Sequence, residues 1–271
     1  MLKLLKELKN SYSEILMPLS VIKNTSKKIE NEPFRHIKLE NFFKENFYSQ
    51  VCEAFQKLKS RGLSPHRCNE RLSHMGKYDC YSLENLEKYR YPLDFFTSNA
   101  WKGYFSQLFD IPLTTGQVTS IHHHLVGSKT GWNHTDFNVV NMFDPSKQNN
   151  INSKYNNEIT YFAIKGKKYP DYIRQAIRSI AVIFYFNNDD WHFGDGGETA
   201  LYKGANPLNP VKLIPPRSNC IFAYEVSPNS YHRFIKNQVS ERNSIICWYH
   251  SEIKTKLQRF PNSLPRYSNE I

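Results

Sequence analysis

Residues 230–250, SYHRFIKNQVSERNSIICWYH, contain two short runs of apolar or alternating residues separated by a polar connection. Such runs, bounded by turn-forming residues, are typical of β-strands. The pattern recurs through most of the chain after residue 115, with Gly, Pro and Asn turns between the runs. We expect strands at 117–126, 134–140, 179–187, 197–203, 211–215, 219–225, 230–235 and 242–250. Short strands at this spacing predict a β-sandwich or a jelly roll.

The chain before residue 115 has a different character, because helical periodicity dominates it. We expect helices at 41–59 and 82–109, a strand at 34–42, a connection at 60–81 and a surface helix with one apolar face at the N-terminus. The fold class is therefore mainly β with flanking helices.

One stretch interrupts the strand pattern: 141–178 is a long insertion rich in Asn and Lys, in which 170–180 resembles a helix. Long insertions in compact domains are often lids or binding loops. We expect a single domain over 1–271, with a helical support at 1–115, a catalytic core at 116–252 and a tail at 253–271.

Composition excludes several classes of protein. With 39% hydrophobic and 14% aromatic residues, the chain has enough apolar material for a core, and disorder is excluded as its main state. No apolar run is long enough for a transmembrane segment. The net charge of +11 permits an anionic substrate, but no nucleic-acid-binding motif is present, so we expect no nucleic-acid partner. The five cysteines are odd in number and form no CxxC motif, which favours a reducing, cytoplasmic location.

A candidate metal pair lies at the start of one expected strand, where His134 and Asp136 are two residues apart. Side chains at positions i and i+2 of a strand point to the same side, so both could reach one ion. The pair alone is weak evidence, because a surface His near a turn Asp has the same spacing. A further His on a distant strand, His232, would complete a set of two His and one carboxylate, which leaves open positions on Fe(II).

A candidate anion clamp follows the third expected ligand. Arg242 and Ser244 open the expected strand RNSIICWYH and share one of its faces. A guanidinium can bind a carboxylate through two hydrogen bonds, and a serine hydroxyl can donate to the same oxygens.

Taken together, His134-x-Asp136, His232 and Arg242-x-Ser244 resemble the Fe(II)/2-oxoglutarate-dependent dioxygenases. Within them the chain is most similar to the prolyl-4-hydroxylase-like branch. Three further segments carry that similarity in the same order: HIKLENFFKENFYSQVCEAF at 36–55, GDGGETALY at 194–202 and RNSIICWYH at 242–250. The resemblance covers most of the chain from about 34 to 250.

This resemblance implies a double-stranded β-helix, a jelly-roll barrel open at one end. It implies Fe(II) held by His134, Asp136 and His232, and 2-oxoglutarate held by Arg242 and Ser244. With O2, the enzyme would hydroxylate a C–H bond and release succinate and CO2, and ascorbate could serve as an additional reductant. Many family members have a Tyr about ten residues before the first metal His; this chain has His124 there, whose imidazole could donate a similar hydrogen bond to the cosubstrate.

Other hypotheses remain open at this stage. The substrate could be a peptidyl residue such as proline, or a small molecule such as an amino acid, a sugar or a natural-product intermediate. The chain could also be a barrel that binds metal or ligand without turnover, or a cupin-like zinc or manganese protein of similar fold. The oligomeric state is not predicted.

Overall fold

The computed structural model describes residues 20–23, 27–68, 70–76, 78–143, 161–206 and 208–267. The predicted N-terminal surface helix lies mostly outside the described residues. Within them, none of the helices combines the length and the apolar composition that crossing a membrane would require.

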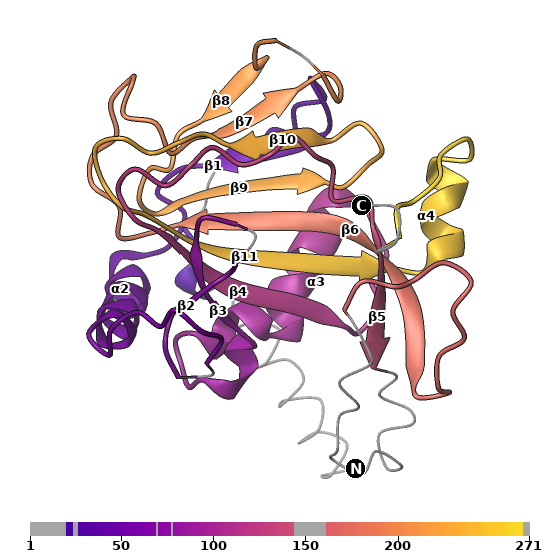
Figure 1. The fold of residues 1–271 in the computed structure, drawn as a ribbon, viewed down its shortest axis with the longest axis horizontal. Coiled ribbons are helices and arrows are strands. Elements are labelled where there is room, and N and C mark those ends of the chain that lie inside the picture. Colours follow the sequence, from indigo (N-terminus) through magenta and orange to yellow (C-terminus); the bar gives the residue numbers. More distant parts are fainter. Residues whose placement is uncertain are drawn as a thin grey trace.

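Two antiparallel sheets form the body of the molecule (Figure 1). The larger, eight-stranded sheet has the order β1-β9-β6-β11-β4-β3-β2, and β5 pairs with β6. Its strands are β1 (His36–Leu39), β2 (Ser73–His74), β3 (Tyr81–Glu84), β4 (Gln117–His124), β5 (Val139–Phe143), β6 (Ile173–Tyr185), β9 (Cys220–Glu225) and β11 (Arg242–Ser251). The smaller sheet has the order β10-β7-β8 and contains β7 (Thr199–Tyr202), β8 (Lys212–Ile214) and β10 (Tyr231–Phe234).

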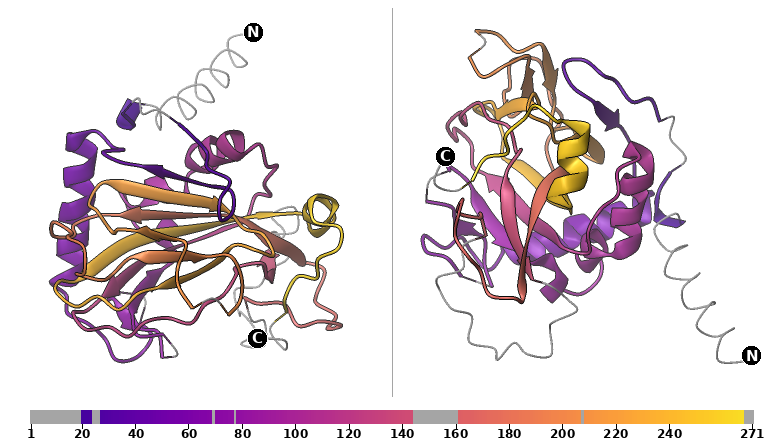
Figure 2. Two further views of the ribbon diagram at one scale, coloured as in Figure 1. Left: turned by 90° about the horizontal axis from the view of Figure 1, so that it is seen from above. Right: turned by 90° about the vertical axis from the view of Figure 1, so that its right-hand side faces the viewer.

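Helices cover one face of the larger sheet (Figures 1 and 2). They are α2 (Glu45–Lys59), α3 (Asn99–Phe109) and the 3₁₀ turns η1 (Leu86–Lys88) and η2 (Asp94–Thr97); α4 (Ile253–Arg259) follows β11. The prediction of a mainly β fold with flanking helices is confirmed.

The central strand β6 separates two apolar cores, because its side chains alternate between the two faces of the sheet. Val182 and Phe184 pack in the core beneath the helices. Ile183 and Tyr185 pack on the other side, where Leu201 of the small sheet joins the same cluster. The candidate site lies on this second side, between the two sheets.

Two helix predictions are wrong in part. The expected helix at 82–109 is helical only from Asn99, while its first residues form β3 and the two 3₁₀ turns. Pro92 lacks a backbone N–H and disfavours the α conformation of Tyr91, so a continuous helix cannot pass through this segment. β3 instead takes its backbone partners from β4.

The helix expected at 170–180 is wrong, because Ile173–Tyr185 forms the 13-residue strand β6. Its partners β5, β9 and β11 supply a complete set of sheet contacts, which outweigh a helical pattern at one end of the segment. The insertion is accordingly shorter than expected, since β5 and β6 occupy both of its ends and 144–160 lies outside the described residues.

The strand expected at 134–140 begins later than predicted. Residues 135–137 are irregular, His134 forms an isolated antiparallel bridge with His232, and Asn138 forms an isolated parallel bridge with Arg266. Regular pairing starts only at Val139, in β5.

Candidate active site

The structure brings the three expected metal ligands together although they are distant in the sequence. One ligand atom each from His134, Asp136 and His232 lies within 4.8 Å of the others. The bridge between His134 and His232 fixes the two backbones through reciprocal N–H···O bonds of 3.1 and 2.9 Å. Their imidazole centroids are 4.6 Å apart. A backbone bridge and an irregular segment therefore position His134 and Asp136, and not the continuous strand that their spacing suggested.

Both imidazoles are oriented by backbone carbonyls. His134 Nδ1 lies 2.9 Å from the Trp132 carbonyl oxygen, and His232 Nδ1 lies 3.0 Å from that of Ser230. A carbonyl can only accept, so Nδ1 carries the proton in each ring and Nε2 keeps a lone pair. Burial, reinforced by His134, lowers the pKa of His232 to about 4. Two imidazoles that donate from Nδ1 to carbonyls and face a carboxylate match the donor set of a metal site, in which Nε2 would bind the ion.

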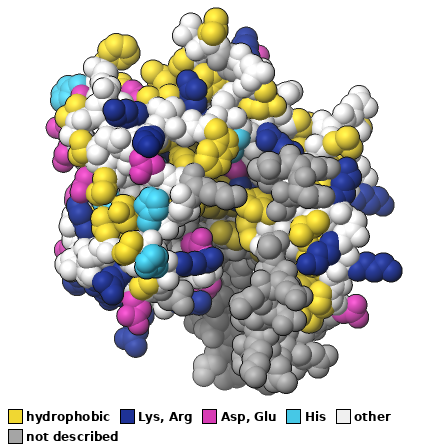
Figure 3. All heavy atoms as spheres, in the orientation of Figure 1, with side chains coloured by type: hydrophobic (Ala, Val, Ile, Leu, Met, Phe, Trp, Pro, Cys, Tyr) yellow, Lys and Arg dark blue, Asp and Glu magenta, His cyan; other side chains and the backbone are white. Residues whose placement is uncertain are grey.

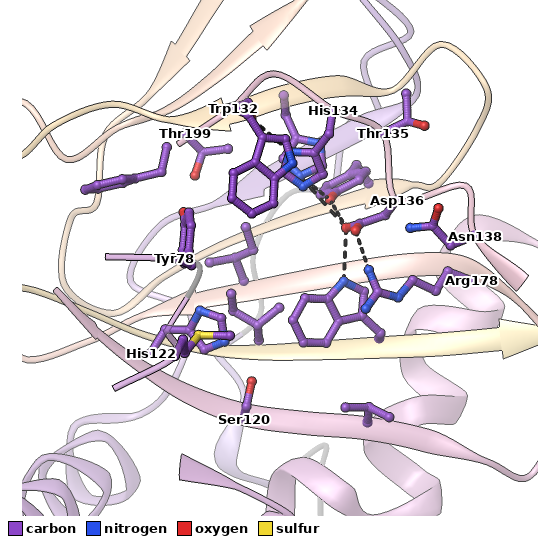
Figure 4. A pocket seen from close by; sticks show the side chains of 18 of the residues that line it. Tyr78, Ser120, His122, Trp132, His134, Thr135, Asp136, Asn138, Arg178 and Thr199 are labelled. Carbon is purple, nitrogen blue, oxygen red and sulfur yellow. Dashed lines mark hydrogen bonds and ion pairs between the residues drawn. The ribbon is translucent and has the colours of Figure 1, made fainter. Parts of the chain in front are cut away.

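Asp136 accepts hydrogen bonds from three side chains (Figure 4). Arg178 Nη1 donates to Oδ1, Tyr224 Oη donates to Oδ2 over 2.9 Å, and Trp248 Nε1 donates to Oδ2 over 3.0 Å. Burial opposes ionisation, but the charge of Arg178, with smaller contributions from the two His and the Trp248 bond, holds the pKa of Asp136 well below its usual value. The carboxylate is therefore ionised and fixed before any metal arrives.

Arg178 is itself enclosed by aromatic rings. Its guanidinium lies 4.5 Å from the Trp248 ring centroid, 5.2 Å from that of Phe162 and 5.6 Å from that of Tyr161. Cation–π contacts of this kind compensate part of the cost of burying the charge. Arg178 was not predicted as a site residue, because it fell in the segment interpreted as a helix.

The anion clamp lies at the other end of the same cavity. Arg242 is buried, and its guanidinium contacts Ser244 Oγ at 3.4 Å and Thr199 Oγ1 at 3.3 Å. The rings of Tyr185 and Phe234 lie 5.1 Å away. Within the described part of the chain no carboxylate forms an ion pair with Arg242, and its Nε has no partner. A buried cation without a counter-ion is costly, and the carboxylate of a bound ligand would remove that cost.

The run His122–His124 divides as expected for a strand. His123 points away from the cavity and pairs with Asn243 Oδ1 at 2.7 Å, whereas His122 and His124 line the cavity. His124 stacks on Phe234 at 4.1 Å, and its Nδ1 lies 3.1 Å from the Asp79 carbonyl oxygen. Its Nε2 is buried without a partner in the described residues. His124 thus faces the same cavity as Arg242.

Cys80, His122 and His124 form a second group that could hold a metal ion by distance alone. The strand register places His124 directly opposite Arg242. Burial, reinforced by Arg242, lowers the pKa of His122 to about 3. A positive charge that disfavours an imidazolium also disfavours a metal cation, so this end of the cavity is suited to an anion.

The expected metal ligands His134, Asp136 and His232 share one cavity of about 520 Å³ with Arg242. Its wall also contains Tyr78, Trp132 and Tyr161, and Trp132 lies at the mouth with 55% of its surface exposed. Figure 3 shows this face, with hydrophobic side chains gathered around a central hollow and Lys and Arg side chains nearby. No sequence pattern indicates Tyr78, Thr199 or Tyr224, because each is an ordinary residue of a loop or strand until the fold brings it to the cavity.

Comparison with known proteins agrees with this site. Residues 150–250 match the model of the 2OG-Fe(II) oxygenase superfamily. No curated protein sequence matches the chain. The fold is similar to that of a Pseudomonas putida prolyl-4-hydroxylase, with a TM-score of 0.51, 12% identity, and coverage of 80% of this chain and 92% of that one.

Two further solved structures are less similar. A Trichoplax adhaerens prolyl hydroxylase in complex with a hypoxia inducible factor peptide fragment gives a TM-score of 0.49 at 14% identity, covering 84% of this chain and 87% of that one. A viral collagen prolyl hydroxylase from Paramecium Bursaria Chlorella virus-1 in a 2OG complex gives 0.49 at 10% identity, covering 80% and 96%.

The two sheets are those of a double-stranded β-helix, the fold of the prolyl-4-hydroxylase-like oxygenases. Over residues 150–250 the chain is similar to the 2OG-Fe(II) oxygenase superfamily, in agreement with the resemblance of its motifs. This match and the His-Asp-His group support an enzyme of that class, a dioxygenase that uses Fe(II), 2-oxoglutarate and O2.

Proposed function

We propose that His134, Asp136 and His232 hold Fe(II), and that Arg242 and Ser244 bind the far carboxylate of 2-oxoglutarate. The observation that carries this proposal is the pairing, in one cavity, of a preorganised two-His, one-carboxylate group with a buried guanidinium that lacks a carboxylate partner. His124 would also contact the cosubstrate from β4, but its Nδ1–H donates to the Asp79 carbonyl oxygen, so the donated hydrogen bond expected from the sequence would require the other tautomer.

When bound, Fe(II) and 2-oxoglutarate supply the oxidising chemistry: O2 is reduced, 2-oxoglutarate becomes succinate and CO2, and one oxygen atom enters a substrate C–H bond. The protein's own residues bind and orient. The carbonyls of Trp132 and Ser230 hold the imidazoles, and Arg178, Tyr224 and Trp248 hold the carboxylate. The buried walls keep bulk water from the reacting centre.

We propose a peptidyl residue as the substrate, with proline as the first candidate. The mouth of the cavity supports this choice, because Met75 and Trp132 are partly exposed there and offer apolar contacts to a chain lying across it. Arg266, which also lines the cavity, would suit an anionic or carbonyl-rich partner. The likeness in fold to a prolyl-4-hydroxylase points the same way.

A small molecule is the second candidate substrate. The cavity of about 520 Å³ falls in the range of pockets that enclose small ligands, and it has to hold the cosubstrate as well. An amino acid, a sugar or a natural-product intermediate of modest size would fit this reading.

We further propose that residues 1–271 act as one catalytic domain and that the protein functions in the reducing cytoplasm. The packing of α2 and α3 on the central sheet supports the first statement. The five free cysteines support the second.

The test is a substrate panel of proline-containing peptides, free amino acids and small metabolites, incubated with Fe(II), 2-oxoglutarate and O2. We expect a product heavier by one oxygen atom, with one succinate formed per product. His134→Ala serves as the inactive control. Product from small molecules but from no peptide would make the second candidate correct. Absence of any 2-oxoglutarate turnover in the wild-type protein, with or without substrate, would contradict the site assignment.

A further inference from the structure

A tyrosine hydroxyl lies among the expected metal-ligand atoms. Tyr224 is in β9, and its ring is fully enclosed by a stacked contact with Phe222 at 5.3 Å and an edge contact with Phe34 at 5.7 Å. Its hydroxyl oxygen lies 2.9 Å from Asp136 Oδ2 and 3.1 Å from His232 Nε2. Asp136 Oδ2 and His232 Nε2 are themselves 3.8 Å apart.

The hydroxyl has a single proton and two neighbouring acceptors. His232 Nε2 is an acceptor because Nδ1 already donates to Ser230. Asp136 Oδ2 carries charge, and hydrogen bonds to charged acceptors are about twice as strong as neutral ones. The carboxylate is therefore the preferred acceptor. Once a metal takes the Nε2 lone pair, Asp136 is the remaining partner of the two.

Counting acceptor positions shows what this bond does. A carboxylate offers about four lone-pair positions, and Arg178, Tyr224 and Trp248 use three of them on Asp136. One position is left for a metal. Coordination through a single oxygen keeps the number of protein ligands at three and leaves room for the cosubstrate and O2.

We propose that Tyr224 is a positioning residue for the metal-binding carboxylate. Its hydroxyl holds Asp136 in the orientation that accepts metal through one oxygen, and it does so from a strand that contributes no ligand. This inference rests on the proposed metal site and concerns a residue outside the expected ligand set.

The decisive comparison is Tyr224→Phe against Tyr185→Phe. Both changes remove one hydroxyl from a buried tyrosine of the same apolar cluster, but the Tyr185 hydroxyl bonds Thr199 Oγ1 at 2.7 Å. The dissociation constant of Co²⁺ is measured by calorimetry on metal-free protein without cosubstrate. We expect Tyr224→Phe to weaken binding about 10- to 100-fold, the usual effect of losing an outer partner of a ligand. Tyr185→Phe should stay within about twofold of wild type, because it touches no ligand atom.

The visible spectrum of bound Co²⁺ gives a second readout that a purely structural role would not move. We expect it to change in Tyr224→Phe, where Asp136 is freer to rotate, and to match wild type in Tyr185→Phe. Equal affinity and an identical spectrum in Tyr224→Phe would overturn the proposal. Tighter binding would also overturn it, because the hydroxyl would then obstruct the metal.

A second variant covers the case in which Tyr224→Phe does not fold, which thermal unfolding of the metal-free protein would show. Trp248→Phe removes the other donor to Oδ2 and keeps an aromatic ring under Arg178, so it should weaken Co²⁺ binding in the same direction. His134→Ala distinguishes failure of the proposed metal site from failure of the role proposed for Tyr224. Unchanged Co²⁺ affinity in His134→Ala would contradict the metal site itself. Loss of affinity there, with normal affinity in Tyr224→Phe and Trp248→Phe, would contradict only the role of Tyr224.

Discussion

The two ends of the cavity treat buried charge in opposite ways. At the metal end, Asp136 receives three hydrogen bonds and the opposite charge of Arg178. At the cosubstrate end, Arg242 has only two long contacts with hydroxyls and an Nε without a partner in the described residues. The negative charge of Asp136 is balanced by other side chains of the protein. The positive charge of Arg242 has no carboxylate partner among the described residues and would be balanced by a bound ligand.

This difference agrees with the roles proposed for the two ends. A metal-binding carboxylate must be ionised and fixed before the ion arrives, so its partners are permanent. A cosubstrate is consumed in every turnover, so its binding group has to be free at the start of each cycle. Burying an unpaired guanidinium is unfavourable because the charge loses its hydration, and the binding of an anion offsets this desolvation free energy.

Loss of a metal ligand should have the largest effect. His134→Ala removes one of the two proposed imidazole ligands, and we expect it to abolish tight Fe(II) binding and turnover. Metal content after anaerobic loading and succinate formation are the measurements. Wild-type metal content and wild-type succinate formation in His134→Ala would contradict the assignment of this end of the cavity to a metal.

Arg178→Met should cost stability, because it leaves the Asp136 carboxylate buried without its counter-ion. Breaking a buried pair from one side typically costs about 3 kcal/mol or more. We expect a comparable fall in the unfolding free energy of the metal-free protein in urea. A fall below about 1 kcal/mol, the level of an exposed pair, would show that the pair is weaker than its burial implies.

Arg242→Met should behave in the opposite way. The metal-free variant should be as stable as wild type or more stable, because it loses a buried charge without a partner. Its affinity for 2-oxoglutarate should fall about 10- to 100-fold, the value of about 1.5–3 kcal/mol for hydrogen bonds to a charged group. Metal binding should be unchanged. Normal cosubstrate affinity would reassign the clamp.

The last prediction concerns stability in acid, which affects both ends of the cavity only indirectly. His250 is buried against the Tyr161 hydroxyl at 2.9 Å, and burial, reinforced by Arg178, lowers its pKa to about 3. The unfolded chain binds a proton near pH 6.5 that the folded chain refuses, so stability falls as the pH drops from about 6.5 to about 3.

The slope from this one group is about 1.4 kcal/mol per pH unit. We expect urea unfolding of His250→Gln to show a shallower loss over the same range. A slope identical to that of wild type would mean that His250 is not the group responsible.

Much of the fold was readable from the sequence because it depends on local patterns. The alternation in segments such as RNSIICWYH locates the strands, and β11 spans Arg242–Ser251 as expected. The segment 170–180 was misread since helix and strand patterns overlap in a short apolar run, and its three strand partners decided the outcome. The break at Pro92 could have been found, because proline rules out a helix interior.

The site residues divide in the same way, into those that local patterns predict and those that depend on tertiary contacts. His134, Asp136, His232 and Arg242 could be selected by residue type and spacing, and the structure brings them to one cavity. Their supporting groups could not, because a donor such as Tyr224 acquires its role only from tertiary contact with Asp136. Arg178 was not predicted as a site residue, because residues 170–180 were interpreted as a helix. Three-dimensional packing therefore supplies the permanent compensation that distinguishes the metal end from the cosubstrate end.

The most direct test is an anaerobic titration of the Fe(II)-loaded protein with 2-oxoglutarate, followed by the visible charge-transfer absorption of a 2-oxo acid chelated to ferrous iron. The account predicts saturation at one cosubstrate per chain in the wild-type protein, no band in His134→Ala, and the same band at higher cosubstrate concentration in Arg242→Met. A wild-type protein that develops no band, or a His134→Ala variant that titrates like wild type, would contradict it.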